Sequence, residues 1–339
     1  MRQKVVLITG ANGEIGHGLI HYLAENTEVN IVAMDVVPLD KNLRPLCKTY
    51  IVGDILDQML LGRLVVEHEI ATIYHLASIL STKAEYNPET AHRINVEGTM
   101  NLLRLAVEQS QWQKKPVKFI YPSSIAAFGI PNLKEKKKSG SVKEWEWNMP
   151  TTMYGCNKLY CEHLGRYYHF HYRQLSADCG TTETVDFRSI RFPGLISAET
   201  IPAGGTSDYG PEMLHSAAKG ESYACFVRPD TTIPFMVMPD AVKALVSLEA
   251  APQEQLTQLV YNITSFSISA KEIFEIVLKA FPEADIQFKV DDCRQKIIDT
   301  WPEHIDDSAA HEDWGWNPDY NCQRAFNDYL IPAIRGRYQ

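Results

Sequence analysis

The amino-acid sequence predicts a doubly wound parallel α/β sheet followed by a smaller α+β domain. Short, continuously apolar segments alternate with longer helical segments over residues 4–122, as buried parallel strands and their crossover helices do. A glycine-rich turn follows the first apolar segment. The chain has 339 residues, which at about 150 residues per domain is enough for two domains.

The elements follow one another in a regular order. The expected strands lie at 5–10, 30–35, 49–52, 72–77, 117–124 and 185–192, and the expected helices at 14–26, 57–69, 88–113 and 154–173. After residue 194 the pattern loosens into a Gly/Pro/Thr-rich loop at 202–211 and a helix at 270–281, where Ser269 and Glu272 form a capping box. We therefore expect a first domain at 1–193, joined by a strand and a helix that return from about 236–250, and a lid domain at 194–339.

Composition and charge exclude several classes of protein. With 45% hydrophobic and 22% charged residues the chain is globular. Its formal net charge of -9 argues against a general nucleic-acid or anionic-membrane binder. No apolar stretch approaches the roughly 18 residues that span a bilayer.

The cysteines favour a reducing compartment. There are seven, an odd number, with no CxxC pair, which argues against a disulfide framework. The apolar run near the N-terminus is too short for a signal peptide. We expect a cytoplasmic protein, although a transit peptide removed earlier would leave no trace in this sequence.

The glycine-rich turn predicts a dinucleotide site. Gly10, Gly13 and Gly16 lie between a strand and a helix, where glycines permit a tight turn and close approach to a pyrophosphate. Asp35 ends the next strand, at the position where a carboxylate accepts hydrogen bonds from the adenine ribose and repels a 2′-phosphate. This pattern favours NAD over NADP. Asp54 and Ile55, after the third strand, would lie beside adenine, or Asp54 would only cap a helix.

A second group of residues predicts proton transfer from an alcohol. Tyr154 and Lys158 are separated by one helical turn, so an ammonium can lower the pKa of the neighbouring phenol. Ser123 and Ser124 end the strand before this helix. The hydroxyls, the phenol and the ammonium can therefore converge at the carboxyl edge of the sheet.

These motifs resemble those of the extended short-chain dehydrogenase/reductase superfamily. The matching segments are TGANGEIG (9–16), Asp35, Asp54-Ile55, HLAS (75–78), NVEGT (95–99), PSSIAAFG (122–129) and YGCNK (154–158). The resemblance is closer to the short-chain type of L-threonine 3-dehydrogenases. It rests on PTTMYG (150–155), RFPGLIS (191–197), GGTSDY (204–209) and the segment from TWP (300–302) to DWGW (313–316).

The resemblance implies a role for each matching residue. Tyr154 would be the general base, Lys158 would hold the nicotinamide ribose and depress the pKa of Tyr154, and Ser124 would bind the reacting oxygen. The implied cofactor-binding residues are Gly10, Asn12, Gly13, Glu14, Ile15, Gly16, Asp35, Asp54, Ile55, Leu76, Ala77, Ser78, Asn95, Tyr154, Lys158, Pro193 and Leu195. The implied substrate-binding residues are Ser81, Ser124, Tyr154, Gly194, Thr206 and Trp301, with Ser78 also facing the substrate.

Some of these assignments have simpler alternatives. The glycine-rich loop with Thr206 could be a plain connection, and Trp301 could belong to the core. The stretch 174–184 is longer than the expected turn, and Glu14 stands where these enzymes often carry a neutral amide. That carboxylate near a pyrophosphate could weaken cofactor binding.

We expect no metal site, because the His- and Tyr-rich helix at 154–173 lacks HExxH spacing. Its aromatic residues, together with the helix at 88–113, are expected to form a homodimer face. In this superfamily the same two helices usually form the dimer.

Three functions are considered. The first is NAD-dependent oxidation of L-threonine at its 3-hydroxyl to 2-amino-3-oxobutyrate. The second is a nucleotide-sugar 4-epimerase or dehydratase, which must also hold a diphosphate, usually with arginines and an asparagine. Between residues 195 and 260 the basic side chains are Lys219, Arg228 and Lys243, which disfavours it. The third is a non-catalytic NAD-sensing protein, a class that commonly lacks the tyrosine or the lysine.

Overall fold

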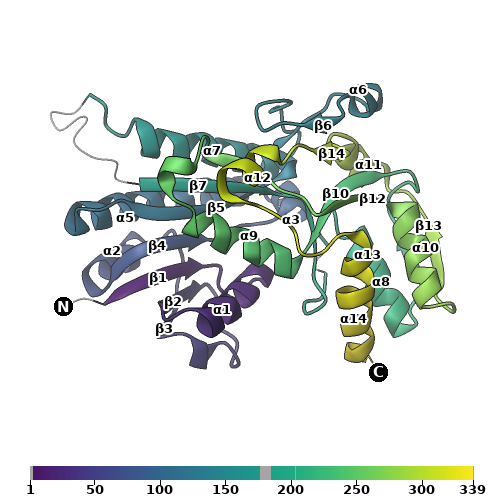
Figure 1. The fold of residues 1–339 in the computed structure, drawn as a ribbon, viewed down its shortest axis with the longest axis horizontal. Coiled ribbons are helices and arrows are strands. Elements are labelled where there is room, and N and C mark those ends of the chain that lie inside the picture. The colour runs from purple at the N-terminus through teal and green to yellow at the C-terminus, as the bar shows by residue number, and fades with distance from the viewer. Residues whose placement is uncertain (1–2, 176–184, 203, 339) are drawn as a thin grey trace.

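A sheet of seven parallel strands forms the centre of the protein. The computed structural model describes residues 3–175, 185–202 and 204–338. The strand order is β3, β2, β1, β4, β5, β7, β11 (Figure 1). The strands are β1 (Lys4–Thr9), β2 (Asn30–Asp35), β3 (Thr49–Val52), β4 (Glu69–His75), β5 (Val117–Ser124), β7 (Val185–Phe192) and β11 (Val260–Asn262). This order reverses between β1 and β4, which confirms the predicted doubly wound Rossmann sheet and places a crevice at that point.

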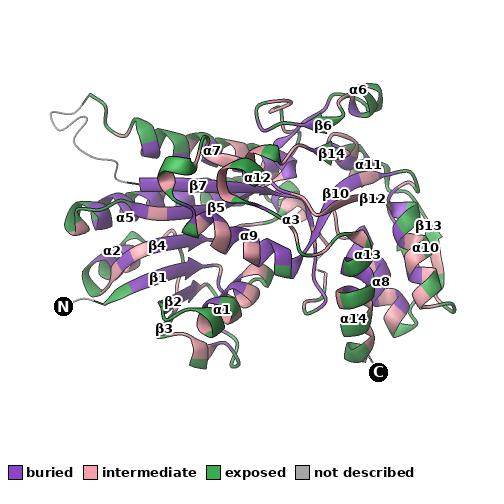
Figure 2. Cartoon of the chain, in the orientation of Figure 1, coloured by how far each residue is buried: buried purple, intermediate pink, exposed green. Residues whose placement is uncertain are grey.

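Helices cover both faces of the sheet. They are α1 (Glu14–Asn26) and α9 (Met238–Ala250) on one face, and α2 (Gln58–Glu67), α5 (Gly98–Gln113) and α7 (Met153–Phe170) on the other. The inner strands between these layers are almost entirely buried, whereas the edge strand β3 is partly exposed (Figure 2). Because both faces are covered, the strands can be continuously apolar, which is the pattern that predicted them.

A second region lies beyond the carboxyl ends of the central strands (Figure 1). It contains a three-stranded sheet of β8 (Gly194–Ile196), β10 (Thr232–Val237) and β12 (Phe266–Ser269), and two small pairs, β9 (Tyr223–Cys225) with β13 (Ile286–Phe288) and β6 (Ser141–Val142) with β14 (His304–Ile305). Its helices are α6 (Leu133–Lys138), α8 (Tyr209–Lys219), α10 (Ala270–Ala280), α11 (Asp292–Asp299), α12 (Ser308–Trp314), α13 (Cys322–Arg324) and α14 (Ile331–Tyr338). One apolar core joins most of these elements to the segment after β5.

Most of the expected elements are present, and the differences are specific. The strand expected near residue 236 is β10, which pairs with β8 and β12 in the smaller sheet, whereas the strand that returns to the large sheet is β11. The helix that follows β10, α9, does pack against α1 and the large sheet. The domain boundary at residue 193 stays a prediction.

Three other segments differ from expectation in their ends or their regularity. The helix expected at 88–113 consists of α4 (Pro88–His92), a π-helical turn (Arg93–Glu97) and α5. The expected loop 202–211 is shorter, because α8 begins at Tyr209. The helix expected at 154–173 ends at Phe170. Most of the long stretch 174–184 lies outside the described residues.

Among the described helices, none is both long and apolar enough to span a membrane. The capping box of α10 is present as predicted: Ser269 Oγ accepts a hydrogen bond from the Glu272 N–H at 3.2 Å, and the Glu272 carboxylate accepts from the Ser269 N–H at 2.8 Å. The six described cysteines are free thiols.

Candidate active site

The glycine-rich turn joins β1 to α1 at the carboxyl edge of the sheet. Gly10 has a φ of +66°, and a Cβ there would lie 2.5 Å from the backbone nitrogen of Ala77. Only glycine lets the two segments approach this closely. Gly13 is the N-cap of α1 and supplies no side-chain hydrogen bond, which leaves the first N–H groups of the helix for an anion. The turn therefore fits the pyrophosphate of NAD.

Asp35 ends β2 with its carboxylate beside this turn. Its Oδ2 accepts a hydrogen bond from the Asn12 N–H at 2.9 Å, and its Oδ1 accepts one from the Val37 N–H at 3.2 Å. This position fits the predicted ribose contact. The side chain of Asn12 has a bracing role, because its Oδ1 accepts a hydrogen bond from the Asp40 N–H at 3.0 Å.

Two further residues of the turn face other parts of the chain. Ile15 packs against the apolar core on the α1 side of the sheet. Glu14 accepts a hydrogen bond from the hydroxyl of Thr200, in the segment after β8. The positions of both side chains therefore depend on contacts outside the glycine turn.

Asp54 and Ile55 follow β3 and have local partners. Asp54 Oδ1 accepts a hydrogen bond from the Leu56 N–H at 2.9 Å, which closes a turn. The N-cap of α2 is Asp57, so the helix-capping alternative for Asp54 is wrong. Ile55 is buried, and a Cβ on Gly98 would lie 2.3 Å from its Cδ1. Their contacts with adenine stay predictions.

The chain after β4 runs beside the glycine turn. The Leu76 N–H donates a hydrogen bond to the Thr9 carbonyl at 3.0 Å, and Ala77 is the residue against which Gly10 packs. The segment continues to Ser81, which begins α3 (Ser81–Tyr86). This arrangement places 76–81 between the nucleotide turn and the second region.

Asn95 holds this segment in position. It lies in the π-helical turn and is 2% exposed. Its Oδ1 accepts hydrogen bonds from the Ile79 N–H at 2.7 Å and the Ser78 hydroxyl at 3.1 Å, and its Nδ2 donates to the Ile79 carbonyl at 3.0 Å and to Asn157 at 3.3 Å. Every hydrogen-bonding group of this amide has a protein partner. Asn95 thus positions the segment at Ser78 and Ile79, and its predicted contact with the cofactor stays a prediction.

The predicted hydroxyl, phenol and ammonium do converge. Ser124 ends β5, and its side chain hydrogen-bonds that of Tyr154 near the start of α7. A Cβ on Gly155 would lie 2.1 Å from the carbonyl oxygen of Ala126, so glycine lets α7 approach the chain after β5. Lys158 lies one turn further along, with its Nζ 5.4 Å from the centre of the Tyr154 ring.

Burial shifts the pKa values of the phenol and of the ammonium. Burial raises the pKa of Tyr154, and the hydrogen bond from Ser124 opposes this only in part. Burial also lowers the pKa of Lys158 to about 8, although Cys161 and Glu162 act in the opposite direction. Lys158 Nζ donates to the Pro122 carbonyl at 2.6 Å. Burial is thus the largest influence on the pKa of Tyr154 in this structure, and the predicted effect of Lys158 on that pKa stays a prediction.

A buried ion pair between Glu162 and Arg191 stabilises this arrangement, and the sequence did not predict it. Glu162, one turn after Lys158, forms a two-pronged contact with Arg191 of β7 at 2.6 and 2.8 Å. Ser123 donates a hydrogen bond to the same carboxylate at 2.5 Å, and Arg191 also donates to the Glu144 carbonyl at 2.9 Å. Since Glu162 and Arg191 are 4% and 2% exposed, the pair locks α7 onto the strands that carry the site.

The segment after β7 carries three predicted contacts with the nicotinamide or the substrate. Gly194 and Leu195 lie in β8, where they pair with Phe235 and Met236 of β10, and Pro193 precedes them. The backbone is extended and follows directly from the carboxyl end of β7. The contacts of these residues with a ligand stay predictions.

Ser81 and Thr206 are 125 positions apart in sequence but form one cluster. The Thr206 hydroxyl and N–H both donate hydrogen bonds to Ser81 Oγ, at 3.0 and 3.3 Å. The loop is also held by Thr82, which donates to the Gly204 carbonyl at 2.7 Å, and by Arg294, which donates to the Gly205 carbonyl at 2.6 Å. Sequence reasoning did not single out Thr82 or Arg294. The loop is therefore docked on α3 rather than free.

Trp301 is 4% exposed and belongs to the apolar core of the second region. Ile125 and Phe128, which follow Ser124, lie in the same core, and Tyr154 packs against it. Trp301 is therefore a core residue, as the simpler alternative predicted, and its contact with a substrate stays a prediction.

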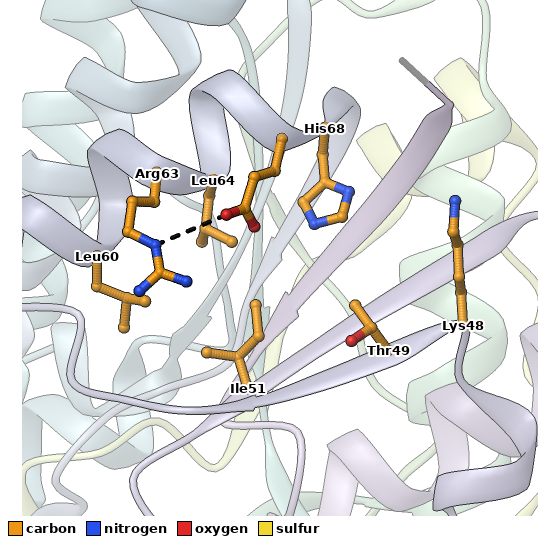
Figure 3. Close-up of a pocket in the computed structure, with 8 residues that line it drawn as sticks. Lys48, Thr49, Ile51, Leu60, Arg63, Leu64 and His68 are labelled. Carbon is orange, nitrogen blue, oxygen red and sulfur yellow. Dashed lines mark ion pairs between the residues drawn. The ribbon is translucent and has the colours of Figure 1, made fainter. Parts of the chain in front are cut away.

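A cavity of about 280 Å³ lies elsewhere, between the edge strand β3 and α2 (Figure 3). Lys48 and Thr49 line it from the start of β3, and Glu67 and His68 from the end of α2. These positions are at the amino edge of the sheet, away from the glycine turn, so the cavity is separate from the candidate site. Within the described ranges no group of three or more His, Cys, Asp or Glu residues is arranged to hold a metal.

Comparison with known proteins agrees with this geometry. Residues 6–264 match the model of the NAD dependent epimerase/dehydratase family. The mitochondrial L-threonine 3-dehydrogenase of Bos taurus is 34% identical over 320 residues, covering 94% of this chain and 80% of that protein. An uncharacterized epimerase/dehydratase of Staphylococcus saprophyticus is 33% identical over 338 residues, covering 98% of both chains.

A solved structure is similar over the whole length. The monomeric L-threonine 3-dehydrogenase from a metagenome has a TM-score of 0.84 and 34% identity, and the match covers 99% of this chain and 100% of that one. The resemblance seen in the sequence is thereby confirmed. The chain belongs to the NAD-dependent epimerase/dehydratase family of enzymes, and L-threonine 3-dehydrogenases are among the members that it resembles over nearly its full length.

Proposed function

We propose that the protein oxidises L-threonine at its 3-hydroxyl with NAD as the acceptor and forms 2-amino-3-oxobutyrate. The observation that carries this proposal is the convergence of Ser124, Tyr154 and Lys158 beside the glycine turn, with the small polar cluster of Ser81 and Thr206 facing the same edge. The names of the bovine and metagenome relatives support threonine as the substrate.

Each residue has a distinct role in this proposal. Tyr154 takes the proton from the 3-hydroxyl, and Ser124, already hydrogen-bonded to the phenol, holds the same oxygen. The ammonium of the buried Lys158 lies close to the Tyr154 ring, and its positive charge favours the phenolate form of that residue. When bound, NAD accepts the hydride from C3. Gly10, Gly13 and the start of α1 would hold its pyrophosphate.

The basic side chains between residues 195 and 260 disfavour a nucleotide-sugar substrate. Arg228 forms ion pairs with Asp299 at 2.8 Å and with Asp230 at 3.1 Å. Lys243 forms one with Asp319 at 2.6 Å. Lys219 lies 3.6 Å from Glu221. An epimerase or dehydratase needs such groups for the diphosphate, so it is the second candidate, favoured by the descriptions of the matched family and of the staphylococcal relatives. A non-catalytic NAD sensor would have no use for Tyr154 and the buried Lys158 on one helix face.

The cofactor preference has a direct test at Asp35. We expect kcat/KM to be clearly higher with NAD than with NADP, because this carboxylate repels a 2′-phosphate. Asp35→Ser should narrow the difference by improving the use of NADP. Asp40→Ser is the matched control, since Asp40 lies in the same loop but pairs with His17 at 3.2 Å. Equal kcat/KM values in the wild type would show that Asp35 does not face the ribose.

The docked loop predicts a role for Thr206 in substrate binding. Thr206→Ala removes a hydroxyl shared with Ser81 and should raise the KM for threonine more than the Kd for NAD, because the hydroxyl lies in the second region rather than on the glycine turn. Thr27→Ala, after α1 at the opposite edge of the sheet, should change neither. An equal loss of NAD and threonine affinity in Thr206→Ala would remove this residue from the substrate site.

We further propose a homodimer through the helical segments 88–113 and 154–173. Tyr160, Tyr167 and Phe170 are exposed on α7, and aromatic residues on a surface helix favour a partner. Light scattering should give twice the mass of one chain. A single-chain mass, as in the monomeric metagenome relative, would refute the dimer.

The free thiols fit a reducing compartment such as the cytoplasm, in which the protein would serve threonine catabolism.

The proposal as a whole is tested by substrate preference. NADH formation, followed by its ultraviolet absorbance, should be much faster with L-threonine than with other hydroxy amino acids or UDP-sugars. Faster turnover of a UDP-sugar would replace the proposal by the epimerase alternative.

A further inference from the structure

Glu14 connects the glycine turn that would bind the cofactor (10–16) to the loop that carries Thr206, which we call the substrate loop (200–202 and 204–208). It is the first residue of α1, and its Oε1 accepts a hydrogen bond at 2.7 Å from the hydroxyl of Thr200. Thr200 lies 186 positions away, in the segment that follows β8 and leads to Thr206. The carboxylate is thus held at the positive end of the helix, beside the place that an anion would take.

This position creates a conflict for an anionic cofactor. An acidic side chain in the first turn satisfies the helix dipole in the same way as a bound pyrophosphate does. We propose that Glu14 is an affinity-setting residue: its carboxylate competes with the pyrophosphate for the start of α1, and Thr200 holds it on the side of the substrate loop. This inference rests on the proposed NAD site.

The charges around Glu14 do not neutralise it. Asp208, from the end of the same loop, acts on it as a like charge. On its own helix His17 is paired with Asp40, and Arg337 of α14 donates to the Glu199 carbonyl. Although Glu14 is exposed, desolvation by the surrounding chain raises the pKa of its carboxyl, with Asp208 adding to the rise and Thr200 opposing it. The negative charge therefore develops at a higher pH than for an ordinary glutamate.

The binding experiment separates this effect from catalysis. The Kd is measured for NADH, ADP-ribose and adenosine with the wild type and Glu14→Gln. Removing the charge should tighten NADH and ADP-ribose, which carry the pyrophosphate, about three- to tenfold, and should leave adenosine unchanged. Glu25→Gln is the matched control, because it removes the same charge about 17 Å away along α1.

The pH dependence gives a second readout with a definite sign. Wild-type affinity for ADP-ribose should fall as the pH rises through the range in which Glu14 loses its proton, a range that lies above that of an ordinary glutamate. The Gln variant should lack this component. Thr200→Val should weaken ADP-ribose binding in the wild type, since the carboxylate loses the partner that holds it aside, and should have a smaller effect in the Gln background.

The outcomes distinguish this inference from the proposed function. If the wild type binds NADH but Glu14→Gln binds it no more tightly, or tightens adenosine equally, the inference is wrong and the cofactor site stands. If the wild type binds neither NADH nor ADP-ribose, the proposed function itself fails.

Discussion

Replacing Tyr154 with Phe is expected to lower kcat by roughly 10²-fold or more, the scale of a lost general base. The ring would still fill its half-buried place beside Ser124 and Lys158, so the Kd for NAD should change little. Steady-state kinetics with threonine and a separate measurement of NAD binding test the two parts. Tyr160→Phe, on the exposed side of the same helix, should leave both unchanged. Near wild-type turnover in Tyr154→Phe would remove the phenol from the mechanism.

Replacing Arg191 with Met is expected to lower the free energy of unfolding by about 3–5 kcal/mol, because Glu162 would be left charged and buried without its partner. Denaturant unfolding measures the change. Arg63→Met breaks an exposed pair, in which Arg63 and Glu67 are 3.6 Å apart, and should cost at most about 1 kcal/mol.

The double variant Arg191→Met with Glu162→Met completes the test of this ion pair. It should recover part of the lost stability, because two apolar side chains can replace a buried pair. Ser123 and the Glu144 carbonyl would still lack partners, so recovery should be incomplete. A single variant as stable as the wild type would show that the pair does not lock α7 onto β7.

Local patterns carried most of the fold prediction. Parallel strands buried on both faces are long apolar runs, so β1, β2, β5 and β7 could be predicted from their composition. The short strand β11 has three residues and no such run, and its place in the sheet depends on contacts far away in sequence. For the same reason β10 looks like a strand of the large sheet, although it pairs with β8 and β12.

The candidate site was predictable where spacing alone sets the geometry. Tyr154 and Lys158 share a helix face, and Gly10 is required by the turn after β1. Burial and long-range pairing are not visible in spacing, which is why the sequence did not predict the raised pKa of Tyr154 or the hydrogen bonds between Asn95 and Ile79.

The buried ion pair had a signal that could have been used. Three charged residues, Asp186, Arg188 and Arg191, interrupt the apolar strand β7. A strand in the middle of a sheet has no solvent for them, so each must find a buried partner. Asp186 and Arg188 do so with each other at 2.6 Å, and Arg191 pairs with Glu162 of α7.

The most direct test follows the hydride itself. L-threonine deuterated at C3 is incubated with the enzyme and NAD, and the reduced cofactor is examined by mass spectrometry. The proposed reaction predicts NADH that carries one deuterium, together with aminoacetone formed when 2-amino-3-oxobutyrate loses carbon dioxide. Unlabelled NADH, or threonine recovered without any reduction of NAD, would contradict oxidation at the 3-hydroxyl.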